Sequence, residues 1–397
     1  KIELIMNRFG LDLLLYLALL VLFIWREANS WSCTRLLNRF IDYISFFYLL
    51  MFGLLVCEVI QVIIAFSNIS KMKDYHTKFV GVVLFCCLPA MFLILASSWR
   101  LTRQHLEEIR AGRAAKKHER AVHIIALPSV YGLMAVSSFV KLFNMGKTIR
   151  KDQMGIAYAR YETCIFVGDL YEAWSLYQFG KLTLELLDET IEMRQSVVNG
   201  PPQSSRGSGS TAGQARWQES SRDVVLSFTA VSSLAWLGPW LLVVVCVLQA
   251  GYNLWLWCFS DPASNWHAVA ANFHKFSFAG MVASGAAIYN IHTIEQVFGH
   301  LMVDYSPLLK FLSVKVLVFF AFWQMKVLQV LRIIHVLPMS EVSIKLIHAV
   351  LLVVECLVSS IMHCWAWGPR EVWYSLEDDT GVHEKAPLES GRWKSYT

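Results

Sequence analysis

Apolar residues fall into long continuous runs along this chain, and polar stretches separate the runs. A helix needs about 20 apolar residues to cross the hydrocarbon layer of a bilayer. The runs predict membrane-spanning helices at residues 9–25, 40–66, 79–98, 121–144, 162–187, 225–249, 269–297, 308–336 and 343–366. The first run is short and resembles a signal-sequence remnant, but no small-residue cleavage pattern follows it, so we expect a span there too.

Composition agrees with this pattern. Hydrophobic residues make up 56% of the 397 residues and charged residues only 16%, whereas soluble domains carry about 25% charged residues. The basic residues lie in loops between the apolar runs, which argues against a nucleic-acid binder. We therefore predict an all-α polytopic membrane protein.

The charges of the loops predict the orientation. Residues 99–120 are strongly basic, whereas 250–268 contain no Lys or Arg. Cytoplasmic loops are enriched in these residues, so 99–120 are expected in the cytoplasm, together with 188–223 and the residues after 367. Residues 145–161, on the predicted outer side, depart from the rule with four basic residues.

Three polar stretches differ in kind. Residues 99–120 contain no proline and are expected to continue the preceding helix or to lie along the membrane surface. Residues 199–216 are rich in Pro, Gly and Ser and are expected to be disordered, and residues 367–397 are expected to form a polar cytoplasmic tail. The predicted organisation is an N-terminal extension with two spans (1–78), a seven-span core (79–366) and this tail.

Ionisable residues inside a span are costly and therefore indicate function or helix pairing. The run at 162–187 has the most of them. On a helix, Glu162 and Asp169 lie about 20° apart, and Glu172 is one turn further along the same face. These carboxylates are expected either to line a polar seam or cavity that binds a substrate, or to pair with basic groups of a neighbouring helix.

The run at 308–336 supplies candidate counter-charges. Lys315 and Lys326 share one side of this helix, and Gln324 lies on the opposite side. An ion pair of either lysine with Asp169 or Glu172 would be electrostatically favourable, and the sequence does not choose between the possibilities.

Two more runs carry polar residues. Asn290 and His292 lie in one, and Glu355 and His363 in the other. His292 and Glu295 have a spacing that metal ligands use on helices, and His363 could complete a site. Hydrogen bonds within the bundle explain these residues better, so we predict no metal and no cofactor.

Several signatures of known chemistry are missing from the sequence. It contains no Walker loop, no G-x-S-x-G, no H-E-x-x-H and no dinucleotide fingerprint, and no filter of the Thr-Val-Gly type. A primary pump, a familiar hydrolase and an ion channel are therefore disfavoured, and we do not expect an enzyme.

Four motifs resemble the organic solute transporter alpha / transmembrane protein 184 family, in the family's order. They are His105-Leu106 with Glu119-Arg120 before ALPSVYGLMAVSS (126–138), GDLYEAWSLYQF (168–179), PLLKFLSVKVLVFFAFWQ (307–324) and VECLVSSIMH (354–363). The third is the most specific. The resemblance covers residues 79–366, and Gly168 stands where the family has an arginine.

The resemblance implies a seven-helix core that moves amphipathic organic solutes, such as steroid conjugates, without an energy source. It also implies a plasma-membrane or endomembrane location and, as in some relatives, a small single-span partner. The candidate substrate pathway consists of Asp169, Tyr171, Glu172, Asn290, His292, Lys315, Gln324, Glu355 and His363. Lys315 is expected to meet an anionic group of the solute.

Two other hypotheses stay open at this point. The protein would be a non-transporting accessory or scaffold subunit of a larger membrane complex if its two extra spans serve as docking surfaces. A metal-dependent intramembrane hydrolase would instead use His292, Glu295 and His363.

Overall fold

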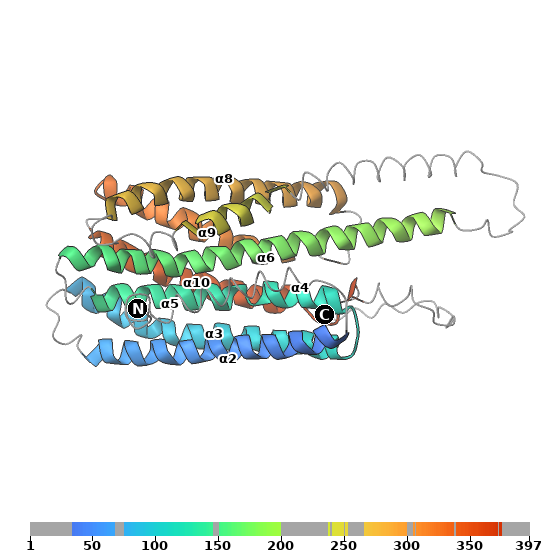
Figure 1. Cartoon of the computed structure of the whole chain (residues 1–397), viewed down its shortest axis with the longest axis horizontal. Coiled ribbons are helices and arrows are strands. Elements are labelled where there is room, and N and C mark those ends of the chain that lie inside the picture. The colour runs from blue at the N-terminus through green and yellow to red at the C-terminus, as the bar shows by residue number, and fades with distance from the viewer. Residues whose placement is uncertain are drawn as a thin grey trace, which may run out of the picture.

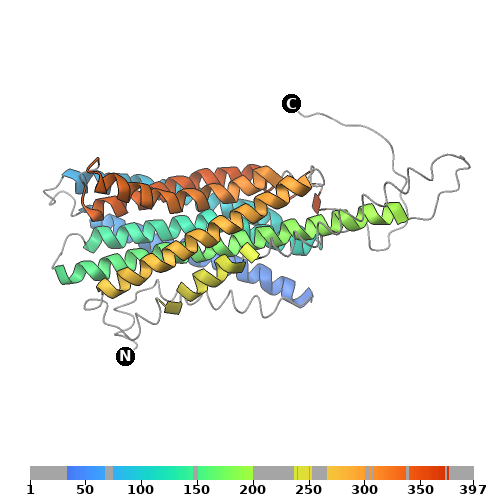
Figure 2. The same ribbon diagram turned by 90° about the horizontal axis from the view of Figure 1, so that it is seen from above.

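The structure is a computed structural model, and it describes residues 34–67, 75–145, 151–199, 237–238, 240–249, 251–252, 266–299, 305, 307–336, 339–371 and 373–374. Over these residues it is helical and contains no strand. The helices lie with their axes roughly aligned in an elongated bundle (Figures 1 and 2). The predicted all-α class is therefore confirmed.

Within the described residues, eight long or medium-length helices form the bundle. Their bounds are α2 Thr34–Ser67, α3 Tyr75–Arg110, α4 Ala115–Ile125, α5 Leu127–Met145, α6 Lys151–Asn199, α8 Trp266–Phe298, α9 Pro307–Ile333 and α10 Glu341–Ala366. A shorter apolar helix, Trp240–Gln249, lies between α6 and α8 in the chain.

Four helical stretches within the described residues are long and apolar enough to cross a membrane. They are Phe40–Ile63, Phe85–Arg110, Ala115–Phe143 and Glu341–Ala366, and they match four of the predicted runs. Helices α6, α8 and α9 occupy three further runs. The run at 9–25 and the first part of 225–249 lie outside the described residues, so the seven-span core remains a prediction.

The stretch 99–120 contains a sharp turn. Helix α3 continues to Arg110, as expected, and the chain then reverses through Gly112, whose φ of 77° favours glycine. Helix α4 follows, and its Lys117 and His118 are each only 1% exposed. Lys117 and His118 therefore lie inside the bundle, whereas Lys116, between the start of α4 and Lys117, is exposed.

The run at 121–144 is divided between two helices. Helix α4 ends at Ile125 and α5 begins at Leu127. Pro128 lies in the first turn of α5, where the missing N–H removes no helical hydrogen bond. Helix α5 is the centre of the bundle, since it packs against α2, α3, α6 and α10 and its residues 127–140 are all buried.

Helix α6 is much longer than the predicted span. It has 49 residues, which at about 1.5 Å per residue exceeds the hydrocarbon thickness of roughly 30 Å. The run at 162–187 is its middle part, and its C-terminal end runs past the neighbouring helices (Figure 1).

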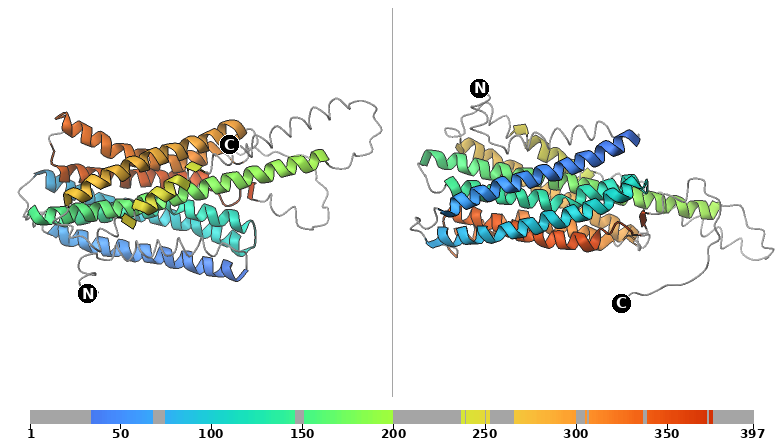
Figure 3. Two further views of the ribbon diagram at one scale, coloured as in Figure 1. Left: turned by 45° about the horizontal axis from the view of Figure 1, so that its top comes forward. Right: turned by 90° about the horizontal axis from the view of Figure 1, so that it is seen from below.

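Helix α2 lies at the edge of the bundle beside α3 (Figures 1 and 3). Two buried hydrogen bonds connect it to the other helices. The Tyr48 and Thr102 hydroxyls are 2.9 Å apart, and the Ser137 hydroxyl donates to Glu58 Oε1 at 2.5 Å. Its outward face is apolar and exposed, as a lipid-facing surface is expected to be.

Candidate functional site

Asp169 lies at the interface between α6 and α5. Its Oδ1 atom accepts a hydrogen bond of 2.7 Å from the Tyr131 hydroxyl. Tyr131 is 2% exposed, and Asp169 is half-buried, so the hydrogen bond is partly buried. The partner that the structure gives Asp169 is thus a phenol of the adjacent helix.

Two further carboxylates of the predicted pathway lie near Asp169. Glu172, one turn along α6, is 9% exposed and interacts electrostatically with Asp169 and with Glu355 of α10. Glu355 in turn accepts a hydrogen bond from the Gln324 side-chain amide of α9. We call Asp169, Glu172, Gln324 and Glu355 the carboxylate cluster; it joins residues of α6, α9 and α10 inside the bundle.

Of the two predicted lysine partners, only Lys326 has a side chain that the structure describes. Lys326 forms no ion pair with Asp169 or Glu172, as judged from the ion pairs of the described side chains. The side chain of Lys315 lies outside the described residues, so its expected pairing stays a prediction.

Tyr171 faces a different part of the bundle. Its hydroxyl donates to the backbone carbonyl of His123 at 3.1 Å. Its ring stacks on Phe47 of α2, with centroids 6.3 Å apart. These contacts turn Tyr171 toward α2 and α4, whereas Asp169 bonds to α5.

The two candidates on α8 also have local contacts. His292 Nε2 lies 3.1 Å from Gln296 Nε2, in an exposed position. The Asn290 amide lies beside Gly238, 2.8 Å from the point where a Cβ atom would stand. Asn290 therefore faces the neighbouring helical segment at Gly238, whereas His292 contacts Gln296 of its own helix.

His363 is buried on α10, at 2% exposure. Its ring lies next to the backbone of Ile125 and Ser313, and neither ring nitrogen reaches hydrogen-bond geometry with a described residue. No group of three or more His, Cys, Asp or Glu among the described side chains is arranged to hold a metal ion. The side chain of Glu295, one of the three ligands in the hydrolase hypothesis, lies outside the described residues, so that ligand set is not tested.

Glu162 has a structural role that separates it from the other carboxylates of α6. It forms an ion pair with Lys345 near the start of α10. The Lys345 ammonium also lies 5.2 Å and 5.0 Å from the ring centroids of Tyr158 and Tyr161. Of the two readings left open by the sequence, helix pairing describes Glu162.

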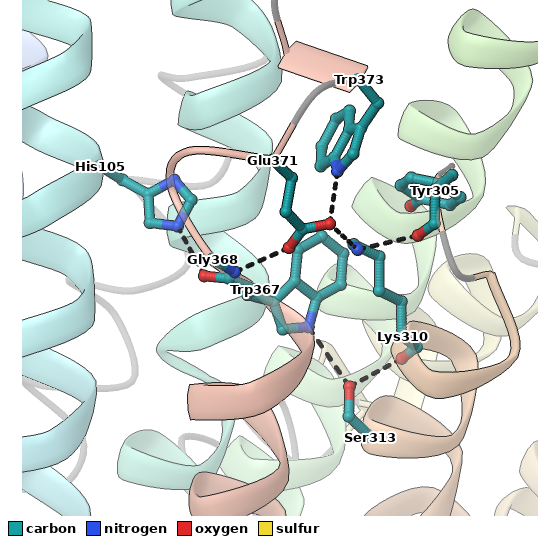
Figure 4. Close-up of polar contacts among 8 residues, drawn as sticks. All are labelled: His105, Tyr305, Lys310, Ser313, Trp367, Gly368, Glu371 and Trp373. Carbon is teal, nitrogen blue, oxygen red and sulfur yellow. Dashed lines mark hydrogen bonds and ion pairs between the residues drawn. The ribbon is translucent and has the colours of Figure 1, made fainter. Parts of the chain in front are cut away.

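Sequence reasoning missed a second polar site, at the end of the bundle where α10 finishes (Figure 4). Lys310 Nζ donates to Glu371 Oε2 at 2.5 Å and to the Tyr305 carbonyl at 2.8 Å. Glu371 also accepts from Gly368 N at 2.8 Å and from Trp373 Nε1 at 2.7 Å. We call Lys310, Glu371, Tyr305, Trp367 and Trp373 the end cluster.

Aromatic rings surround the lysine of the end cluster. The Lys310 ammonium lies 4.8 Å, 5.6 Å and 5.4 Å from the ring centroids of Tyr305, Trp367 and Trp373. These cation–π contacts add to the ion pair and are stronger where water is excluded. Residues 367, 373 and 374, which the sequence places in the polar tail, are at most 4% exposed.

The end cluster continues into α3, α4 and α6. His105 Nε2 lies 3.2 Å from the Trp367 carbonyl, and Lys117 Nζ lies 2.7 Å from Glu189. Burial raises the pKa of Tyr374, which stacks on His118, well above its ordinary value. The basic loop, the end of α6 and the residues after α10 thus meet at one end, as the predicted orientation requires.

The family model described as organic solute transporter Ostalpha matches residues 80–372. The chain belongs to the organic solute transporter alpha family. This match confirms the resemblance and, with the apolar helices, an integral membrane protein. No curated protein and no solved structure matches the chain.

The match defines a family core, residues 80–372, that includes the carboxylate cluster and Glu371. Helix α2 precedes this family core. Its Glu58, 4% exposed, nevertheless bonds to Ser137 inside the core, and its Phe47 covers Tyr171. An element outside the Ostalpha match is thus packed onto it through buried polar contacts.

Proposed function

We propose that this protein mediates facilitative transport of amphipathic organic solutes, such as steroid conjugates or lipid-like molecules. Family membership supports solute transport in general. The observation that carries the proposal is the carboxylate cluster, in which Glu172 is buried and Glu355 accepts a hydrogen bond from Gln324 inside an apolar bundle. Burying such groups away from water is expensive, and a polar route through the membrane would explain why they are there.

An amphipathic solute would use both parts of this environment. Its hydroxyl groups would hydrogen-bond to Glu172, Gln324 and Glu355, while its apolar face would contact the surrounding side chains. We propose Lys315 for the anionic group of a conjugate, since carboxylates alone would repel it. Lys315 belongs to α9, the helix that also holds Gln324.

The test is uptake of a labelled steroid sulfate by liposomes that contain the full chain. Lys315→Met and Glu355→Gln should abolish or strongly reduce uptake, and Glu107→Gln should not, because Glu107 is exposed and pairs with Arg103. A facilitative carrier should equilibrate the solute without concentrating it. Unchanged uptake in Lys315→Met would remove the role of that lysine, and no protein-dependent uptake of any amphiphile would contradict the function.

The accessory-subunit alternative has one supporting observation, the uncovered apolar face of α2, where Phe46, Leu49 and Ile63 are more than half exposed. Native mass spectrometry of the gently extracted protein distinguishes the two. A small single-span partner together with a bound amphiphile would favour transport. A large assembly of fixed stoichiometry, combined with no uptake, would favour the accessory role.

A further inference from the structure

Gly168 and Tyr131 are in unusually close contact. A Cβ atom placed on Gly168 would lie 2.9 Å from Cδ2, 3.0 Å from Cε2 and 3.2 Å from Cγ of the Tyr131 ring. Any side chain at residue 168 would therefore overlap the ring. The ring of Tyr131 fills the space beside the α6 backbone that only a glycine leaves open.

This packing determines where the Tyr131 hydroxyl lies. The ring rests on residue 168, and the hydroxyl donates to Oδ1 of the next residue, Asp169, at 2.7 Å. A hydrogen bond to a carboxylate is about twice as strong as one between neutral groups. Tyr131 itself is 2% exposed, so its ring is held by the surrounding side chains.

We propose that Tyr131 is a positioning residue for Asp169 and that its ring fits there only because residue 168 is a glycine. The proposal deepens the proposed function: Tyr131 holds the Asp169 carboxylate in place beside Glu172, with which Asp169 interacts electrostatically. Two chemically different changes should then have the same effect. Tyr131→Phe removes the donor but keeps the ring, and Gly168→Ala keeps the donor but displaces the ring.

The first readout is the infrared carboxyl band of Asp169 in purified, lipid-reconstituted full chain, assigned by its disappearance in Asp169→Asn. Tyr131→Phe and Gly168→Ala should both shift this band, and the double variant should not shift it further. Gly285→Ala is the matched control, because it is also a helical glycine and nothing lies within 4 Å of its added Cβ. It should leave the band unchanged.

The second readout is steroid-sulfate uptake by the same liposomes. Each single variant should reduce uptake roughly tenfold, the factor that corresponds to about 1.4 kcal/mol. Uptake by the double variant should be no lower than that of the single variant with the lower uptake. A wild-type band in Tyr131→Phe would overturn the proposal, as would multiplied losses in the double variant. A shifted band with unchanged uptake would overturn the positioning role.

The band is recorded without solute, so it remains informative if the wild-type chain transports nothing. In that case the proposed function fails while the band still decides whether Tyr131 holds Asp169. If Gly168→Ala does not yield monodisperse protein, Tyr131→Phe alone decides, because it keeps the ring that packs on Gly168.

Discussion

Lys310 and Glu371 are 61 residues apart in the chain, yet Lys310 Nζ and Glu371 Oε2 lie 2.5 Å apart. Lys310 lies in the first turn of α9 and Glu371 follows α10, so the ion pair connects the residues after α10 to α9 at the end of the bundle. The lysine side chain is 1% exposed and the glutamate 25%. The buried charge of Lys310 therefore depends on Glu371 for its compensation.

Removing the glutamate charge is expected to destabilise the fold. Glu371→Gln leaves the buried Lys310 ammonium without its anion, a change that costs about 3 kcal/mol for buried pairs. Fluorescence-detected thermal unfolding in detergent measures it. Lys310→Met combined with Glu371→Gln should lose less than the sum of the two single changes, because no charge is then left uncompensated. Glu107→Gln, in an exposed pair, serves as the control and should change stability by under about 0.5 kcal/mol; an equal loss there would contradict the role of burial.

The ion pair of Glu162 and Lys345 predicts a rescue. Glu162→Lys places two cations together between α6 and α10. It should reduce the free energy of unfolding by about 3 kcal/mol and therefore lower the melting temperature. Adding Lys345→Glu restores opposite charges and should recover more than half of the loss. Recovery stays incomplete because the cation–π contacts with Tyr158 and Tyr161 are lost. No recovery in the exchanged variant would mean that the pair does not connect the two helices.

The sequence predicted those parts of the fold that depend on local pattern. Apolar runs gave the helical class and four candidate spans, and the motif around Lys315 and Gln324 indicated the family. The break at Ala126 and the turn at Gly112 were missed. A helix interruption inside an apolar run changes neither composition nor mean hydropathy, so these signals do not show it.

The candidate site was predicted in part, and for a physical reason. Helical periodicity places Asp169 and Glu172 on one face, but it says nothing about which residue of another helix faces them. The choice of Tyr131 as the partner of Asp169 depends on Gly168, a close packing contact that no pattern of polar residues reveals. Lys310 was not predicted as part of a site, because its partner Glu371 is 61 residues away and no helical periodicity relates the two.

Helix α2 should behave as a separable part that binds the family core. If residues 1–74 and 75–397 are produced together as two chains, they should copurify, because Glu58 bonds to Ser137 and Tyr48 to Thr102 in buried positions. Glu58→Lys should abolish copurification, since it places a cation where Ser137 Oγ donates its proton. Phe46→Ala is the control, because Phe46 is 62% exposed on the outward face. Copurification that survives Glu58→Lys would show that the hydrogen bond between Glu58 and Ser137 is not needed to hold α2.

The last prediction separates two possible courses of the pathway. Gln324→Leu removes the side-chain amide that donates a hydrogen bond to the Glu355 carboxylate. A hydrogen bond to a charged group contributes about 1.5–3 kcal/mol. Uptake of the steroid sulfate should fall at least roughly tenfold. Gln296→Leu is the matched control on α8: it breaks an exposed contact with His292 and should leave uptake close to wild type. If Gln296→Leu instead causes the larger loss, the solute follows the α8 surface with His292 and Asn290, and the carboxylate cluster only holds the helices together.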